Sequence, residues 1–181
     1  MAMDLNLSKA GLKISSLLLI VVVMNCADSK AELSAPQRIG LKEHTRTISG
    51  NQAANIINKM HNQTVAAAAN AIVEYGKDKK DTLYISFYEE QEQAREAFEL
   101  MINKMAAAEK SPFFHLMPLP AYQNKVYFTL GMGARHYIFV SGNYLLWLQT
   151  SQSFGGELPP ELLVLYPISL ESADNPSASF A

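Results

Sequence analysis

The strongest constraint on the fold is the segment 135–150, in which two apolar stretches flank a Gly142-Asn143 pair. Such a pair between two alternating stretches is typical of a two-residue hairpin turn of a primed type. We therefore expect three cross-strand pairs: Val140 with Leu145, Ile138 with Trp147, and His136 with Gln149. Because both faces of this hairpin are largely apolar, its strands should lie in the centre of a sheet that is covered on both sides.

Hydrophobic periodicity predicts most of the remaining elements. Apolar residues recur at helical spacing in 50–62 and 89–108, and they alternate in 82–88 and 126–130. The segment 71–75 is a short candidate strand that would pair with 82–88. The segment 160–166 fits a short helix or an edge strand, and its prolines favour the helix. The proline-containing segment 113–124 is expected to be a loop whose apolar residues fold over the sheet edge or line a pocket.

This order of elements predicts an α+β fold. We expect a sheet of about five mostly antiparallel strands with the helices packed on one face, for which ferredoxin-like proteins are the nearest analogy. The predicted division of the chain is a signal peptide at 1–25, a lipid anchor and flexible tether at 26–46, a single domain at 47–168 and a disordered tail at 169–181.

The N-terminal residues have the pattern of an export signal. Lys9 and Lys13 precede an uncharged run of 11 residues, Ile14 to Met24, which fits the apolar core of a signal peptide, roughly 7–15 residues long. A membrane-spanning helix needs about 20 apolar residues, and only 14 residues separate Lys13 from Asp28. The sequence therefore favours export over a permanent membrane span.

Cys26 is the only cysteine in the chain, and it directly follows the apolar run. Val23-Met24-Asn25-Cys26 resembles the lipobox of bacterial lipoproteins, although Asn25 stands where that family has a small residue. The resemblance implies that Cys26 receives a thioether-linked diacylglycerol, becomes the first residue of the mature chain and is acylated again on its amine. Several acyl chains anchor a protein stably, whereas one binds only marginally. The alternatives are ordinary cleavage, for instance after Ala27, an uncleaved anchor, and a buried, unreactive cysteine.

The remainder of the chain contains the segments EYG, DTLYISFYEEQEQA, VYFTLGMGARHYIF and YLLWL. Over roughly residues 47–150 it resembles small exported bacterial proteins of an uncharacterised family. That family implies no activity, cofactor or catalytic residue.

Charge and cysteine content exclude two further classes. The 181-residue chain has a formal net charge of −2, whereas nucleic-acid binding needs a basic surface, so we expect no nucleic-acid partner. With Cys26 committed to the anchor, no internal disulfide can form, and the apolar core must hold the fold.

The sequence shows no motif for catalysis or metal binding. The four histidines, His44, His61, His115 and His136, have no metal-type spacing, and the Gly-x-Ser-x-Gly motif of a nucleophile is absent. We therefore expect no metal, no cofactor and no catalytic residue, although the many glutamates leave a carboxylate pair open. The sequence favours a non-enzymatic domain without excluding a hydrolase.

One group of residues is a candidate binding patch. Arg135 and His136 follow a Gly-Met-Gly segment, near Tyr137 and Trp147 in the proposed sheet, and His61 could approach from the first helix. A positive patch edged by aromatic rings suits a carboxylate, a glycan or a partner loop. The structural alternative is an arginine stacked on a tyrosine, with a hydrogen-bonded histidine at the sheet edge.

These expectations together predict a lipid-anchored protein of the bacterial cell envelope, with its domain on the extracytoplasmic side. It would contact the membrane through Cys26 and bind or scaffold an envelope protein without catalysis. The alternative is an exported domain that binds a small ligand, with a pocket near Phe113–Tyr122, Arg135 and His136.

Overall fold

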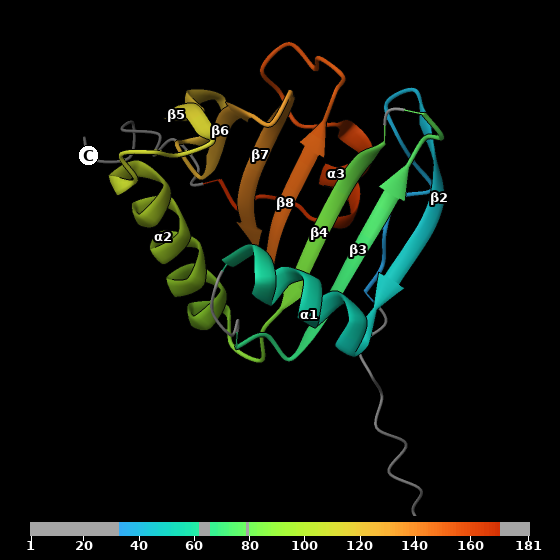
Figure 1. Ribbon diagram of the computed structural model, residues 1–181, viewed down its shortest axis with the longest axis horizontal. Coiled ribbons are helices and arrows are strands. Elements are labelled where there is room, and N and C mark those ends of the chain that lie inside the picture. The colour runs from blue at the N-terminus through green and yellow to red at the C-terminus, as the bar shows by residue number, and fades with distance from the viewer. Residues whose placement is uncertain (1–32, 62–65, 79, 171–181) are drawn as a thin grey trace, which may run out of the picture.

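A computed structural model of the chain describes residues 33–61, 66–78 and 80–170 (Figure 1). Its strands are β1 (Arg38–Ile39), β2 (Lys42–Ser49), β3 (Ala69–Tyr75), β4 (Asp81–Phe87), β5 (Phe113–Pro118), β6 (Val126–Gly131), β7 (Ala134–Ser141) and β8 (Tyr144–Thr150). Its helices are α1 (Gly50–His61), α2 (Gln91–Ala107), the short 3-10 helix η1 (Pro120–Tyr122) and α3 (Pro160–Leu165). The strands form one 8-stranded sheet in the order β1-β2-β3-β4-β8-β7-β6-β5, and every neighbouring pair is antiparallel.

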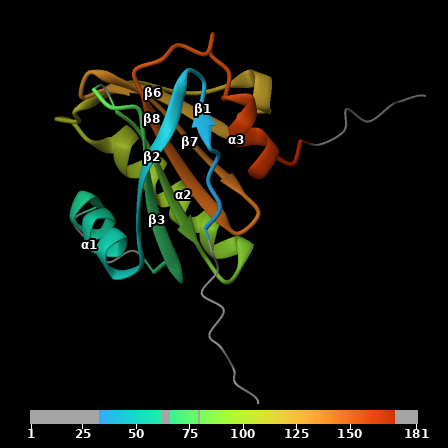
Figure 2. The same cartoon turned by 90° about the vertical axis from the view of Figure 1, so that its right-hand side faces the viewer.

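The sheet consists of two halves that meet between β4 and β8. The first half runs from β1 to β4, the second from β5 to β8, and α2 carries the chain from β4 to the far edge, where β5 lies. Figure 2 shows the sheet edge-on, with its strands curled into a half-barrel. The helix α2 therefore connects two strands that are not neighbours in the sheet, crossing from its centre to its edge.

The expected five-stranded, ferredoxin-like fold is wrong, because three strands at the sheet edges escape the periodicity. In β2 five consecutive residues, from Glu43 to Thr47, are exposed, so the strand shows no alternation. Because β1 is only two residues long, most of β2 forms the edge of the sheet on this side. Polar edge strands of this kind protect a sheet against pairing with other chains. In β5 the register shifts between Phe114 and Met117, and His115 has a left-handed φ of 57°. The expected loop at 113–124 is thus partly a bulged strand.

Part of the segment 26–46, which was expected to be a flexible tether, is folded into the sheet. Both β1 and the first half of β2 lie within it. The strands are held there by side chains of distant residues: Gln152 Nε2 donates to the Ile39 carbonyl at 3.0 Å, and Lys42 Nζ donates to Asp81 at 2.6 Å. Such long-range partners leave no signal in a local sequence window.

The central hairpin has the predicted register. Val140 faces Leu145, Ile138 faces Trp147 and His136 faces Gln149. Gly142 has a φ of 53°, and Asn143 is not among the residues with positive φ, as in a hairpin turn with glycine at its first central position. The side chain of Asn143 donates to the Glu89 carbonyl at 2.7 Å and ties this turn to the start of α2.

Helices lie on both faces of the sheet, so the expectation that they share one face is also wrong. Tyr137, Phe139 and Leu146 belong to the larger cluster. This cluster also contains Leu162 of α3 and Tyr166, which directly follows that helix. The opposite face carries α1 over the first half of the sheet and α2 over the second. The short helix predicted at 160–166 is present, but it packs behind the sheet, as Figure 2 shows.

Candidate functional site

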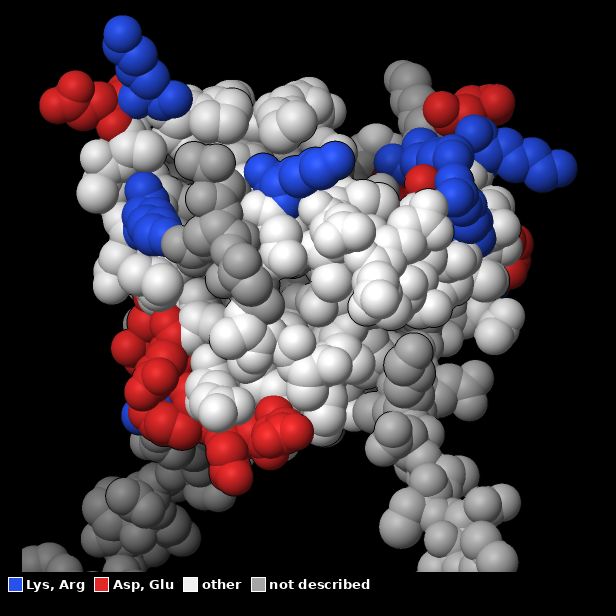
Figure 3. All heavy atoms as spheres, turned by 60° about the horizontal axis from the view of Figure 1, so that its bottom comes forward, with Lys and Arg blue, Asp and Glu red and all other residues white. Residues whose placement is uncertain are grey.

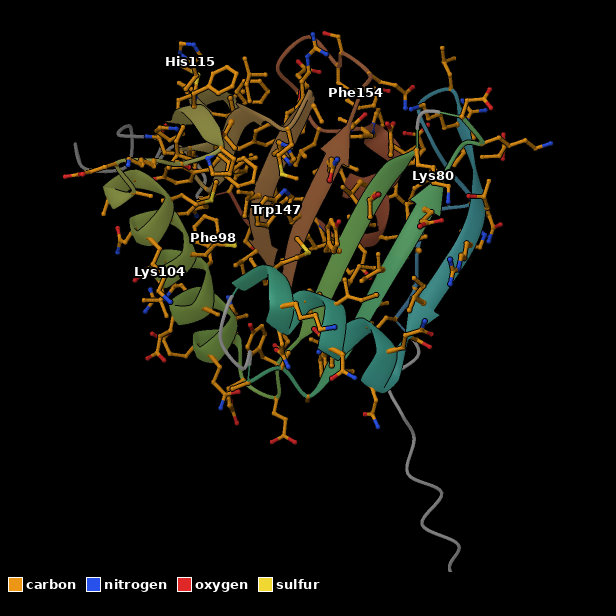
Figure 4. All side chains as sticks on the ribbon, viewed as in Figure 1. Lys80, Phe98, Lys104, His115, Trp147 and Phe154 are labelled. Carbon is orange, nitrogen blue, oxygen red and sulfur yellow. The ribbon has the colours of Figure 1, made fainter. Side chains whose placement is uncertain are left out.

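A cavity of about 620 Å³ lies between α1, α2 and the sheet. Its wall on α1 is Met60, and its floor is formed by side chains of β4 and β8, among them Leu145 and Trp147. In Figure 4 Trp147 lies over the middle of the sheet, on the side that α2 borders with Phe98 and Lys104. A volume of this size falls within the range of about 300–1,000 Å³ that is typical of small-molecule sites.

The wall formed by α2 follows from its sequence periodicity. Residues 93, 96, 97, 100, 101, 104, 105 and 108 line the cavity, and this spacing of three and four places them on one face of a helix. The middle of this face is apolar and includes Leu100, Met101 and Met105. Met101 is 7% exposed, but Leu100 is 49% exposed and Met60 on the opposite wall is 46% exposed. The cavity therefore opens to the surface between two uncovered apolar side chains.

The floor is held in place by a hydrogen-bonded pair. Trp147 Nε1 donates to His136 Nδ1 at 2.9 Å, and His136 Nε2 lies 3.0 Å from the Gly131 carbonyl oxygen. An indole nitrogen can only donate, so Nδ1 must be the acceptor and Nε2 must carry the proton. The ring of Phe113 packs edge-on against His136 at a centroid distance of 5.1 Å. His136 therefore orients the floor and has no ring nitrogen left for a ligand.

Burial also keeps this histidine neutral. His136 is 1% exposed, and burial lowers the pKa of its ring below the ordinary value of 6.5, although the bond to Gly131 opposes that change. The neutral form fits the hydrogen bonds, because a proton on Nδ1 would face the N–H of the indole. The structural alternative of a hydrogen-bonded histidine therefore describes His136, within the sheet instead of at its edge.

The hydroxyl of Tyr88 is a buried polar group without a partner in the described part of the chain. Tyr88 lines the cavity beside the start of α2 and is 2% exposed, and its oxygen makes no hydrogen bond. Burial raises the pKa of Tyr88 above its ordinary value, so the hydroxyl keeps its proton. The neighbouring Ser86 Oγ donates to Asn70 Oδ1 at 2.8 Å, and an amide is not a base that could activate it as a nucleophile.

The predicted binding patch is divided between the two faces of the sheet. His136 and Trp147 share the face of the cavity, whereas Tyr137 packs in the cluster behind the sheet, and Arg135 donates to the Ser151 carbonyl at 3.4 Å. His61 is the last residue of α1, and its side chain is outside the described part of the structure. Neither Arg135 nor His136 lines the cavity.

The predicted pocket residues 113–122 contribute to the cavity only through Phe113. Leu116 packs against the cluster beneath α2, and Leu119 and Tyr122 pack against the cluster behind the sheet. The α2 residues that form the cavity wall, Leu100, Met101 and Met105 among them, were not predicted as site residues. Their helical spacing was visible, but a methionine stripe of this kind is equally typical of a core.

A second hollow, of about 890 Å³, lies between residues 33–37, β2 and the start of β3. Its lining is mostly alanine, serine and other small or polar residues, and it contains no tyrosine, tryptophan or phenylalanine. Ligand sites are usually lined by apolar and aromatic side chains with a few polar groups. We therefore assign the candidate site to the smaller cavity beside α2.

Charged side chains are sparse on the face of the molecule that carries α1. Figure 3 shows a broad uncharged face on the α1 side, with lysines and arginines along its margin and acidic groups at one corner. Among residues 33–61, 66–78 and 80–170 no group of three or more His, Cys, Asp or Glu side chains could hold a metal ion. The candidate lipidation site, Cys26, lies outside the described residues.

In the described part of the chain, no helix combines the length and the apolar character needed to cross a membrane. Comparison with known proteins found no matching family model, no matching curated protein and no matching solved structure.

Proposed function

We propose that the chain is an exported, lipid-anchored domain that binds a small, largely apolar molecule without catalysis. The observation that supports this most directly is the cavity of about 620 Å³ between α1, α2 and the sheet. Its apolar walls are uncovered at Met60 and Leu100, and apolar surface that is left open on a folded domain marks a site of interaction.

The composition of the lining favours binding over chemistry. Leu100, Met101 and Met105 present flexible apolar side chains, and Leu145 and Trp147 form a firm floor. Methionine adapts its shape to its neighbours, so this wall can close around a ligand of variable outline. Apart from Tyr88, the titratable side chains that line the cavity are exposed and lie at its rim. They are Glu96, Lys104 and Lys110.

A neutral fluorescent probe, N-phenyl-1-naphthylamine, tests this proposal. We expect its fluorescence to rise when it binds the wild-type protein. Ala97→Phe adds a ring to a side chain that lines the cavity, and it should weaken binding at least about tenfold because it fills space that the probe needs. Ala106→Phe is the matched control, because Ala106 is exposed on the same helix and does not line the cavity. Equal binding by the two folded variants would contradict the proposed site.

The lipid anchor is supported by the lipobox-like segment that ends at Cys26. Intact-mass analysis of the protein from bacterial membranes should find a chain that starts at Cys26 and has the added mass of a diacylglycerol and an acyl group. Cys26→Ser should abolish the added mass. A soluble chain that starts after Cys26 would contradict the anchor and leave the binding proposal standing.

Scaffolding of an envelope protein is a second candidate function, because the same uncovered apolar face could receive part of a protein. A purified envelope partner whose capture is lost with Ala97→Phe and kept with Ala106→Phe, in a protein that binds no small probe, would favour scaffolding over ligand binding.

A further inference from the structure

We infer that the ligand of this cavity is a single-chain amphiphile with an anionic head group, such as a fatty-acid carboxylate, an inference that rests on the proposed function. The cavity face of α2 has one acidic end and one basic end, with an apolar stretch between them. Glu96 lies toward the start of the helix, Lys104 lies in its last turn, and Leu100 and Met101 lie between them. At a rise of 1.5 Å per residue, the two charges are about 12 Å apart along the helix axis.

The basic end of the cavity continues beyond the helix. Lys110 also lines the cavity, next to Ser111 and Phe113, and it is exposed. None of the ion pairs between described residues includes Lys110. The partial negative charge at the C-terminal end of α2 opposes an anion, but it is smaller than the positive charge of the two lysines and only reduces their attraction. A lysine at an exposed rim can hold a carboxylate while both groups stay partly in water, which avoids the cost of burying a charge.

The charges also give the ligand one preferred direction. A head group at the Lys104–Lys110 end is attracted there and kept away from Glu96, and its hydrocarbon chain then lies along Leu100, Met101 and Trp147. A neutral apolar molecule would have no such preference. A cationic head group would be repelled at the lysine end of the cavity. At the opposite end, only Glu96 would attract it.

Quenching of Trp147 provides the test, because Trp147 is the only tryptophan of the chain and lies in the cavity floor. The full chain in phosphatidylcholine vesicles is titrated with bromine-substituted palmitate and, in parallel, with the bromine-substituted alcohol of the same length. We expect saturable quenching by both, with the carboxylate bound about tenfold more tightly. Prior loading of the palmitate into donor vesicles, compared with its addition from solution, distinguishes a bilayer source from a free one. Tighter binding of the acid than of the alcohol in either arm supports the inference.

Three variants separate the head group from the apolar site. Lys110→Gln should weaken palmitate binding about three- to tenfold and leave the alcohol unchanged. Lys77→Gln, which removes the same charge in the β3–β4 turn away from the cavity, should change neither. Leu100→Gln, at a half-exposed position where the fold tolerates a polar side chain, should weaken both.

Two results would overturn the inference, and they differ in what they say of the proposed function. Equal binding of the acid and the alcohol, unchanged by Lys110→Gln, would exclude the anionic head group but keep an apolar ligand. Absence of quenching by either molecule would contradict the apolar ligand itself.

Discussion

Lys42 Nζ donates a hydrogen bond to Asp81 Oδ1 at 2.6 Å, and this pair joins the edge strand β2 to the central strand β4. Asp81 is fully buried. Its second oxygen accepts hydrogen bonds from Thr150 Oγ1 at 2.7 Å and from Gln152 Nε2 at 2.6 Å. Burial raises the pKa of Asp81, but the hydrogen bonds from Lys42, Ser151, Gln152 and Thr150 outweigh burial and hold the pKa below its ordinary value.

We predict that Asp81→Asn lowers the free energy of unfolding by about 3 kcal/mol, because removal of one member of a buried ion pair leaves the other uncompensated. Urea denaturation measures the change. Glu74→Gln is the control, since its partner Lys80 is 47% exposed, and it should cost at most about 1 kcal/mol. Equal losses in the two variants would show that the Asp81 network does not hold the β2 edge.

The central part of the fold could be predicted from the sequence because its signals are local. The register of β7 and β8 follows from Gly142-Asn143 and a period of two, and α1 and α2 follow from apolar residues at helical spacing. The edges could not be predicted in this way. The position of β2 depends on the bond between Lys42 and Asp81, which are 39 residues apart. Asp81 is in turn held by Gln152, which is 71 residues further along the chain.

The candidate site was predicted only in part, for a related reason. Trp147 and Phe113 were recognised as site or pocket residues, and both line the cavity. Alternation within β7 places Arg135 and Tyr137 on the face opposite His136, so the three could not form one patch. The wall of α2 was missed because helical periodicity shows that a stripe is apolar but does not show whether another element covers it.

Tyrosine-to-phenylalanine substitutions should separate unpartnered from partnered hydroxyls. The Tyr75 and Tyr88 hydroxyls are buried without a hydrogen bond to described residues, whereas Tyr166 OH donates to the Ser34 carbonyl at 2.6 Å. An unsatisfied buried polar group costs about 1–3 kcal/mol, so we predict that Tyr88→Phe and Tyr75→Phe keep or raise the free energy of unfolding. Tyr166→Phe should lower it by about 1 kcal/mol. Thermal unfolding measures all three, and losses of equal size would mean that the two buried hydroxyls have partners in solution.

Gly131 leaves the space in which Phe113 reaches the cavity. A Cβ at position 131 would lie 2.5 Å from Phe113 Cδ1 and 2.7 Å from the Pro112 carbonyl oxygen. We predict that Gly131→Ala displaces β5, lowers stability and shifts the fluorescence of Trp147, whose ring centroid is 5.5 Å from that of Phe113. Gly133→Ala is the control. Gly133 has a φ of +73°, which is strained for alanine, but a Cβ there would meet nothing within 4 Å. The variant should therefore lower stability without moving the Trp147 spectrum. A Trp147 spectrum unchanged by Gly131→Ala would contradict the close contact.

His136 should make the stability of the protein depend on pH. The pKa of His136 is lowered in the folded state, chiefly by burial, from the ordinary value of 6.5. Between the folded and the unfolded pKa, the unfolded chain binds the proton more readily than the folded one does. The contribution of neutral His136 to the free energy of unfolding is therefore complete above about pH 6.5 and is lost as the pH falls below that value. We predict that the urea midpoint decreases between pH 7.5 and pH 5, and that His136→Asn, which cannot titrate but offers Trp147 an acceptor, removes most of this dependence. His115→Asn, at an exposed position in β5, is the control and should keep it. If His136→Asn retained the full pH dependence, other groups would have to cause the loss of stability in acid, and the neutral Trp147–His136 hydrogen bond would not control it.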